Sequence, residues 1–260
     1  EFTPAQATIP HSTTREDHMR EVRRIVDSLA GEDGKVVAAR VIRTDTAIDL
    51  NATFEALDKA YPEAFVFMFS TPLHGTWIGA SPELLLECDG DTLRTMALAG
   101  TRPVGTEGAW DAKNVREQQL VSEHIVKCLN KYSMTVSATP PREKAAGSVE
   151  HICTPIEAQL PQLPRFSPLT WQARLQKIAC DLSPTPAVCG SERTSALRLI
   201  EELESFPREL YGGFCGPCSV RRKMAAFYVN LRSAKCSPSA VAAFAGGGIT
   251  PMSNLSLIHI

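Results

Sequence analysis

Four short apolar segments follow one another closely in the first half of the chain, and their spacing constrains the fold more than any other feature. They lie at residues 64–70, 76–79, 84–88 and 92–97. Turn residues such as Gly, Pro and Asp separate them. Connections this short cannot contain the crossover that parallel strands require, so the pattern predicts an antiparallel sheet.

Helical patterns surround these strands. Residues 13–16 have the form of a capping box, and apolar residues recur behind it at helical spacing as far as Gly31. The sequence also predicts helices near 54–61, 115–130 and 194–205, strands at 35–42, 224–234 and 240–244, and an exposed loop at 139–144. Because strands and helices come in blocks, we expect an α+β fold with antiparallel sheets and helices packed outside, in one domain over residues 1–260.

The composition argues against several classes of protein. The 260 residues are 43% hydrophobic, which is enough for a substantial core. Lys and Arg number 27 against 29 Asp and Glu without a long run of either charge, so we expect no nucleic-acid partner. No apolar run reaches the roughly 18 residues of a membrane helix. The eight cysteines are scattered rather than framed for disulfides. These features are typical of a monomeric, cytoplasmic globular protein with no membrane partner.

An acid and a group of backbone donors are predicted at neighbouring ends of the sheet. Residues 79–84 read Gly-Ala-Ser-Pro-Glu-Leu and form a turn that carries Glu83. Residues 96–103 contain a second turn, which opens on Gly100 and Thr101. A carboxylic acid beside backbone N–H groups suits a small anionic substrate.

Six motifs occur in an order that resembles the chorismate-utilising enzymes. They are Gly-Ala-Ser-Pro-Glu-Leu-Leu at 79–85, Leu-Ala-Gly-Thr-Arg at 98–102, Glu-His-Ile-Cys-Thr at 150–154, Pro-Thr-Pro-Ala-Val-Cys-Gly at 184–190, Arg-Glu-Leu-Tyr-Gly-Gly at 208–213 and Gly-Gly-Gly-Ile at 246–249. The match runs from Lys35 to Ser253 and is closest to the isochorismate synthase branch. That resemblance implies an isomerase that adds water at one ring carbon of chorismate while the original hydroxyl leaves from another. The product would feed menaquinone or siderophore biosynthesis.

The resemblance also implies roles for individual residues. Lys35 matches the base that activates water, Glu83 the acid that protonates the leaving hydroxyl, and Glu117 a carboxylate that holds Mg²⁺, with Glu123 as a second candidate. The positions that match substrate contacts are Gly100, Thr101, His151, Tyr211, Arg232, Gly246, Gly247 and Gly248. A lysine accepts a proton only when neutral and a glutamic acid donates one only when protonated, so these roles require a partly dry pocket. Taken singly, Lys35, Glu83 and Glu117 are typical of solvated surface positions, and only the ordered set favours catalysis.

Related activities leave alternatives open. Family members that use ammonia usually carry a different residue at the place of Lys35, and those that make aminodeoxychorismate usually have a lysine where this chain has Ala99, so we expect water as the nucleophile. Salicylate synthase shares both features and is the first alternative, although residues 184–190 look more like the isochorismate branch. An alternative of another class is a dithiol oxidoreductase, because Cys215 and Cys218 have the spacing of a redox centre.

The chain also departs from the family pattern. Relatives usually continue past the glycines into a helix whose Glu residues complete the metal site, whereas residues 253–260 contain no acid and Ile258 falls near the expected glutamate. Ser183 stands where a histidine is usual, and relatives have a long segment before the position of Lys35. We therefore expect a fragment truncated at both ends, which binds Mg²⁺ poorly and turns over slowly or not at all.

Overall fold

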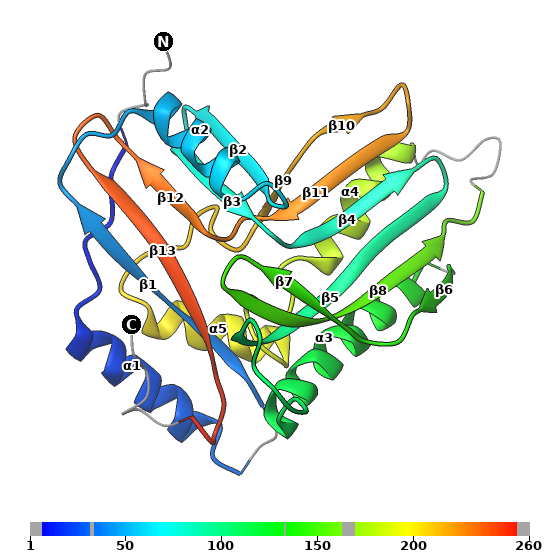
Figure 1. Cartoon of the computed structure of the whole chain (residues 1–260), viewed down its shortest axis with the longest axis horizontal. Helices are drawn as coiled ribbons and strands as arrows, with labels where there is room; N and C mark the ends of the chain where they lie inside the picture. Colours follow the sequence, from blue (N-terminus) through cyan, green and yellow to red (C-terminus); the bar gives the residue numbers. More distant parts are fainter. Residues whose placement is uncertain (1–6, 32–33, 133, 163–169, 254–260) are drawn as a thin grey trace. The chain divides into compact units, whose positions relative to one another are not determined.

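The computed structural model describes residues 7–31, 34–132, 134–162 and 170–253. Contacts divide the chain into two compact units, each assembled from separate stretches of sequence (Figure 1). The first unit contains Glu1–Ser81, Val188–Gly212 and Asn230–Ile260, and the second contains Pro82–Ala187 and Gly213–Val229. The single domain over residues 1–260 stays a prediction.

The first unit is built on a five-stranded antiparallel sheet in the order β1-β13-β12-β3-β2. Its strands are β1 (Val36–Thr44), β2 (Phe65–Thr71), β3 (Gly75–Ser81), β12 (Ser233–Cys236) and β13 (Val241–Ile249). Its helices, among the described residues, are α1 (Arg15–Ser28), α2 (Leu50–Ala60) and α5 (Arg193–Leu203).

The two faces of this sheet have different neighbours. Val22 of α1 and Ile200 of α5 pack around Val36 of β1, so these helices cover one face. Side chains alternate along a strand, and Val41 therefore belongs to a second cluster on the opposite face, around the fully buried Trp77. Each such buried apolar side chain contributes about 1.5–3 kcal/mol to folding.

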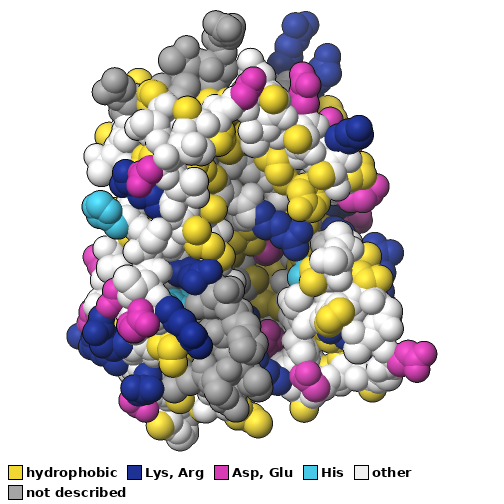
Figure 2. All heavy atoms as spheres, turned by 60° about the vertical axis from the view of Figure 1, so that its left-hand side comes forward, with side chains coloured by type: hydrophobic (Ala, Val, Ile, Leu, Met, Phe, Trp, Pro, Cys, Tyr) yellow, Lys and Arg dark blue, Asp and Glu magenta, His cyan; other side chains and the backbone are white. Residues whose placement is uncertain are grey.

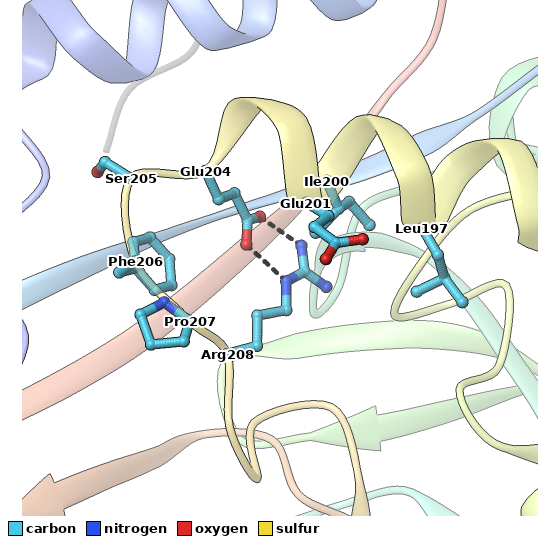
Figure 3. Close-up of a pocket in the computed structure, with 8 residues that line it drawn as sticks. All are labelled: Leu197, Ile200, Glu201, Glu204, Ser205, Phe206, Pro207 and Arg208. Carbon is cyan, nitrogen blue, oxygen red and sulfur yellow. Dashed lines mark hydrogen bonds and ion pairs between the residues drawn. The ribbon is translucent and has the colours of Figure 1, made fainter.

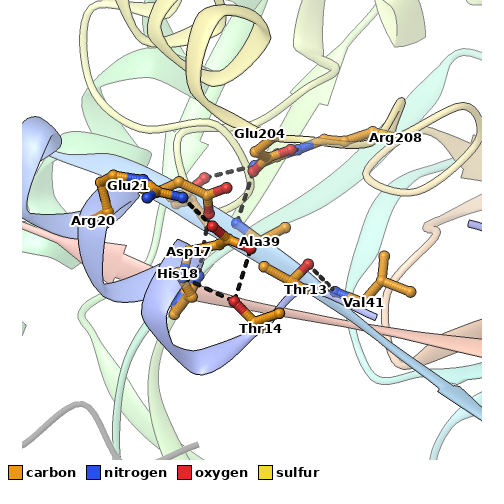
Figure 4. A network of polar contacts seen from close by, with 11 residues as sticks. Thr13, Thr14, Asp17, His18, Arg20, Glu21, Ala39, Val41, Glu204 and Arg208 are labelled. Atoms are coloured by element: carbon orange, nitrogen blue, oxygen red, sulfur yellow. Dashed lines mark hydrogen bonds and ion pairs between the residues drawn. The ribbon is translucent and has the colours of Figure 1, made fainter. Parts of the chain in front are cut away.

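The outer edge of β1 is capped along its whole length. The N–H groups of Lys35, Val37, Ala39, Val41 and Arg43 point away from β13 and donate, in that order, to Ser191 Oγ, the Cys189 carbonyl, Glu204 Oε1, Thr13 Oγ1 and Ser12 Oγ. All five distances lie between 2.7 and 3.0 Å. Figure 4 shows the threonine and glutamate contacts side by side along the strand. Every outward donor of this edge strand is thus satisfied.

Helix α1 begins one residue later than the capping box at 13–16 predicts. Thr14 is the N-cap, and its Oγ1 accepts a hydrogen bond from the Asp17 N–H at 3.0 Å. Thr13 is instead used by the sheet, where its hydroxyl accepts from Val41. Two adjacent threonines therefore serve two different elements, which local sequence could not distinguish.

The second unit contains an eight-stranded antiparallel sheet with the main order β10-β11-β4-β5-β8-β6, to which β7 adds beside β8 and β9 beside β11. Its strands are β4 (Leu84–Asp89), β5 (Thr92–Pro103), β6 (Thr135–Ala138), β7 (Arg142–Ala146), β8 (Val149–Gln159), β9 (Phe214–Cys215), β10 (Cys218–Ser219) and β11 (Met224–Val229). Its described helices are α3 (Ala112–Asn130) and α4 (Trp171–Leu182). Helix α3 runs along β5 and β8 (Figure 1).

Three local predictions were wrong. The loop predicted at 139–144 overlaps β7, whose residues pair with β8. The turn predicted to open on Gly100 and Thr101 lies inside β5, and the single strand predicted at 224–234 is two strands, β11 and β12, which belong to different sheets. Helix α4 and strands β6 and β8 were not predicted.

The fold class is confirmed as α+β with antiparallel sheets and helices packed on them. Within the described residues no helix has both the length and the apolar character needed to cross a membrane. On the surface in Figure 2, Lys and Arg side chains are interspersed with Asp and Glu side chains. This mixture agrees with the near-neutral net charge of −2.

Candidate functional site

Lys35 is buried at the start of β1, with 6% of its surface exposed. Its backbone is held by the segment that follows the 184–190 motif. The Lys35 N–H donates to Ser191 Oγ at 2.7 Å, and the Ser191 hydroxyl returns a longer bond of 3.4 Å to the Lys35 carbonyl. A lysine is rarely this buried unless it is paired or functional.

Gly190 is the residue that permits this close approach. Its φ of +122° lies in a region that favours glycine, and it bridges to Val36. A Cβ added at Gly190 would lie 2.0 Å from the Lys35 carbonyl oxygen. The motif at 184–190 therefore ends in glycine because the backbone of Lys35 occupies the space of a side chain.

Tyr211, Gly246 and Gly248 lie on the same face of the sheet as Val37. Val37 is opposite Gly248 and Ala39 is opposite Gly246 in the register, and cross-strand partners share a face. Gly247 is opposite Ala38 and therefore lies on the other face. A Cβ at Gly246 would come within 2.9 Å of the Tyr211 hydroxyl oxygen, so the missing side chain makes room for the phenol. Burial raises the pKa of Tyr211 to about 12, and the hydroxyl is therefore a hydrogen-bond donor at neutral pH.

The segment that carries Tyr211 is anchored on both sides. Arg208 donates from Nε to Glu204 at 2.7 Å and from its terminal nitrogens to the carbonyls of Val37 and Val188. On the other side, both carboxylate oxygens of Glu209 accept from Lys235, at 2.7 and 2.8 Å. These contacts fix the loop on the sheet.

Arg232 adopts a left-handed backbone conformation between β11 and β12, with φ of +48°. Its carbonyl accepts a hydrogen bond from the Ala80 N–H at 3.2 Å. An arginine in this region of φ and ψ carries strain of about 1–3 kcal/mol, which is commonest at functional sites. The side chain of Arg232 is exposed, and its role as a substrate contact stays a prediction.

In the second unit, Glu83 occupies the turn before β4 with 5% of its surface exposed. Thr185 Oγ1, which is also buried, donates to Glu83 Oε1 at 3.4 Å. The Glu83 carbonyl accepts from the Val229 N–H at 3.0 Å. Lys35 and Glu83 thus belong to different units. That the two side chains face one another across a shared site stays a prediction.

Gly100 and Thr101 form a β-bulge opposite His151. Two residues of β5 face one residue of β8 at this point, and Gly100 takes a φ of +73°. His151 Nδ1 lies 2.8 Å from the Gly100 carbonyl, which can only accept, so Nδ1 carries the proton in this contact. Thr101 Oγ1 is 3.1 Å from the same nitrogen. The structure thereby brings together three residues predicted to bind the substrate.

Asn114 joins this bulge to the helix that carries Glu117. Its Oδ1 accepts from the Thr101 N–H at 3.1 Å, and Asp111 holds it through the Asn114 backbone and side-chain amides. These hydrogen bonds lower the pKa of Asp111, which keeps the cap ionised. Glu117 lies one turn further along α3, so the bulge and Glu117 are held in a fixed register.

Glu117 is the better of the two metal candidates on α3. Its side chain is 12% exposed and lies 3.9 Å from Lys113 Nζ, whereas the side chain of Glu123 is 67% exposed and pairs with Arg116. No group of three or more His, Cys, Asp or Glu able to hold a metal exists among the described residues. A Mg²⁺ ion at Glu117 would therefore need oxygen ligands from a substrate and water, which Mg²⁺ readily uses. The expected position of a further acid, Ile258, lies outside the described residues.

Three residues in these contacts were not singled out from the sequence: Thr185, Ser191 and Asn114. Thr185 lies inside a motif that the sequence did mark, so its position was a usable signal. Ser191 and Asn114 act through bonds to residues 156 and 13 positions away, and no local pattern indicates such partners.

Cys215 and Cys218 do not form a redox centre in this fold. They lie opposite Tyr228 and Ala225 on β11, three positions apart on an extended strand. Three strand positions span about 10 Å, whereas disulfide Cα atoms lie within roughly 7 Å of each other. Burial also raises the pKa of Cys215 to about 11, the opposite of a reactive thiol. The geometry argues against the dithiol oxidoreductase alternative.

A pocket of about 570 Å³ lies beside α5 and is lined by four apolar residues and by Glu201, Glu204, Ser205 and Arg208 (Figure 3). The figure shows the guanidinium facing the carboxylate. Glu204 and Arg208 also form hydrogen bonds with the backbone of β1, so this ion pair holds the sheet and α5 together. This pocket is therefore not the candidate site.

Comparison with known proteins agrees with this arrangement of motifs. Isochorismate synthase EntC of Escherichia coli strain K12 is 31% identical over 259 residues, covering 95% of this chain and 63% of EntC. Isochorismate synthase MenF of the same strain is 31% identical over 260 residues, covering 92% of this chain and 57% of MenF. The chain thus spans about three fifths of the length of these relatives.

Solved structures extend the likeness to the fold. The menaquinone-specific isochorismate synthase MenF from Escherichia coli superposes with a TM-score of 0.83 at 28% identity, over 98% of this chain and 60% of MenF. Anthranilate synthase component I from Streptococcus pneumoniae TIGR4 gives a TM-score of 0.80 at 19% identity, over 98% of this chain and 56% of that one, and shows the shared fold alone. The family model described as Chorismate binding enzyme matches residues 2–256. This chain belongs to the chorismate-binding enzyme family.

Proposed function

We propose that the chain carries the catalytic residues of an isochorismate synthase and that its substrate is chorismate. The observation that carries the proposal is the burial of Lys35 and Glu83, at 6% and 5% exposure, within the motifs of a chorismate-binding enzyme. Lys and Glu are almost never this buried on an ordinary surface, so both side chains have a use inside the protein. The relatives at 31% identity that are named isochorismate synthases support this choice within the family.

In the proposed reaction, Lys35 in its neutral form removes a proton from water as the water oxygen bonds to a ring carbon. The two conjugated double bonds of the ring shift, and the carbon–oxygen bond of the original hydroxyl breaks. Glu83 gives its proton to that oxygen, which leaves as water. One water enters and one leaves, so substrate and product are isomers. The Thr185 hydroxyl bound to Glu83 Oε1 orients the carboxyl group for this transfer.

The remaining proposed contacts bind the anionic substrate. Arg232 grips one carboxylate through two parallel hydrogen bonds. The Tyr211 hydroxyl donates beside Gly246, where the strand has no side chain to obstruct a ligand. His151 and Thr101 orient the ring substituents from the bulge of β5.

Glu117 would hold Mg²⁺ together with a substrate carboxylate and water, and the ion would neutralise that carboxylate. Because no group of three ligands occurs among the described residues, we expect Mg²⁺ to bind weakly until chorismate is present. Titration of the protein with Mg²⁺, with and without chorismate, measures this directly by calorimetry. Equally tight binding without substrate would contradict a shared site.

The decisive experiment follows the oxygen. The protein is incubated with chorismate and Mg²⁺ in ¹⁸O-labelled water. The products are separated by chromatography, and their masses are measured by mass spectrometry. The expected product is isochorismate with one solvent oxygen, formed slowly because this chain is expected to bind Mg²⁺ weakly. Lys35→Met and Glu83→Gln should each slow its formation by roughly 10²–10⁴. Lys177→Met, at an exposed position on α4, is the matched control and should leave the rate unchanged.

Other products would redirect the proposal. Salicylate as the main product would identify the lyase of the first alternative. Unchanged chorismate after prolonged incubation would refute the activity of this chain, and equal rates in wild type and Lys35→Met would refute the role of the lysine.

A further inference from the structure

Two cations on β7 have sulfur atoms for neighbours instead of acids. Lys144 Nζ lies 3.5 Å from the thioether of Met96, a weak acceptor, although the lysine is half-buried. Arg142 is exposed, and its charge opposes the rise that burial causes in the pKa of the Cys153 thiol. In the described part of the chain, neither cation forms an ion pair with an acid. A half-buried ammonium with so poor a partner indicates room for an anion.

The nearby acids are engaged elsewhere. Glu143 stands between the two cations in the sequence but points to the other face of β7, where it accepts from Arg102 and from the Trp110 indole at 3.1 Å. Glu157, further along β8, pairs with Arg94 at 3.2 Å. Neither acid is available to neutralise β7.

Lys144 and Arg142 share a sheet face with His151. Lys144 is opposite His151 in the register and Arg142 is opposite Cys153, and cross-strand partners project from the same face. Helix α3 lies on the opposite face, where Gln118 donates to Thr154. The cations therefore continue the surface formed by His151 and the bulge at Gly100 and Thr101.

We infer that Lys144, assisted by Arg142, forms a carboxylate-binding subsite beside His151, and that it takes one carboxylate of the dianionic substrate. This inference rests on the proposed function, because it identifies the anion as part of chorismate. The substrate carboxylate replaces the thioether as the partner of Lys144, which exchanges a weak contact for a charge-assisted hydrogen bond. Two adjacent cations also draw a dianion toward this face.

The test is a calorimetric titration of the 260-residue protein with chorismate. Lys144→Met keeps most of the side-chain stem and removes the charge, and it should raise Kd roughly ten- to a hundredfold. Lys144→Arg should bind within a few-fold of wild type, because it restores the cation. Lys177→Met removes the same charge from an exposed site on α4 and should leave Kd unchanged. The difference between Lys144→Met and wild type should shrink as salt is raised, since a subsite open to solvent is screened.

The outcomes separate this inference from the proposed function. If wild type binds chorismate and Lys144→Met binds it equally well, the subsite is refuted while the proposed function stands. If wild type does not bind chorismate, both fail. If Lys144→Met and Lys177→Met weaken binding by the same factor, the effect is one of net charge and the subsite is refuted. A loss confined to Lys144→Met and restored by Lys144→Arg supports it.

Discussion

Gly190→Ala should separate β1 from the segment that holds Lys35. The added Cβ would meet the Lys35 carbonyl oxygen at 2.0 Å and the Lys35 carbonyl carbon and Val36 Cα at 2.8 Å each. All three are backbone atoms, so no side-chain rotation relieves the overlap. The φ of +122° adds strain of about 1–3 kcal/mol, and overpacking adds a similar amount. Together they should lower the free energy of unfolding by roughly 2–6 kcal/mol.

Urea unfolding followed by tryptophan fluorescence measures this loss, because Trp77 is fully buried in the same unit. With a denaturant slope of about 3 kcal/mol per molar, the midpoint should fall by roughly 0.7–2 M. Gly247→Ala is the stability control, since its added Cβ meets no atom within 4 Å, and it should shift the midpoint little. If Gly190→Ala unfolds at the wild-type midpoint, the close approach to Lys35 does not exist in solution and the reasoning is wrong.

Three further perturbations test other parts of the structure. Glu204→Gln should lower the free energy of unfolding by about 3–5 kcal/mol, because it leaves the largely buried Arg208 guanidinium without its counter-charge. Urea unfolding measures this loss, and a value under about 1 kcal/mol would mean that solvent screens the ion pair. Asn114→Ala should speed hydrogen exchange of the Thr101 amide, whereas Asn114→Asp keeps the acceptor oxygen and should not. Equal exchange rates in both variants would exclude the hydrogen bond between Asn114 and the Thr101 amide. Burial raises the pKa of the Cys236 thiol from 9.0 to about 11. Between these pH values the folded state keeps a proton that the unfolded state loses, so the free energy of unfolding that the neutral thiol contributes is complete below pH 9 and is lost as the pH rises from 9 to 11. Urea midpoints measured across that range should fall less steeply in Cys236→Ala, and an identical slope would contradict the shift.

The parts of the fold that depend on neighbouring residues could be predicted from sequence. The strands between residues 64 and 97 were recognised because short turns leave them few pairing choices. Helix α4 was missed although Thr170 caps it and Leu175, Ile178 and Leu182 recur at helical spacing, so that signal was present. The glycines at 246–248 lie in a strand that pairs with β1, from the other end of the sequence, and no local pattern indicates that pairing.

The order of the motifs in the sequence identified the candidate site residues. It did not predict the hydrogen bonds that hold those residues in place. Lys35 and Glu83 are far apart in sequence from Ser191 and Thr185, their hydrogen-bond partners. Such pairs form only when strands and loops from distant stretches meet. The sulfur contacts of Lys144 and Arg142 belong to the same class, because β7 was expected to be a loop and no face could be assigned to its side chains.

The capped edge of β1 limits how this protein can associate with itself. Strand exchange and fibril growth begin when an unpaired edge offers its amides to another chain. Here a second molecule could recruit β1 only after residues 12–13 and 189–191 had detached and Glu204 had released the Ala39 amide. Joining through this strand therefore requires local unfolding first, which makes β1 a protected boundary of the sheet.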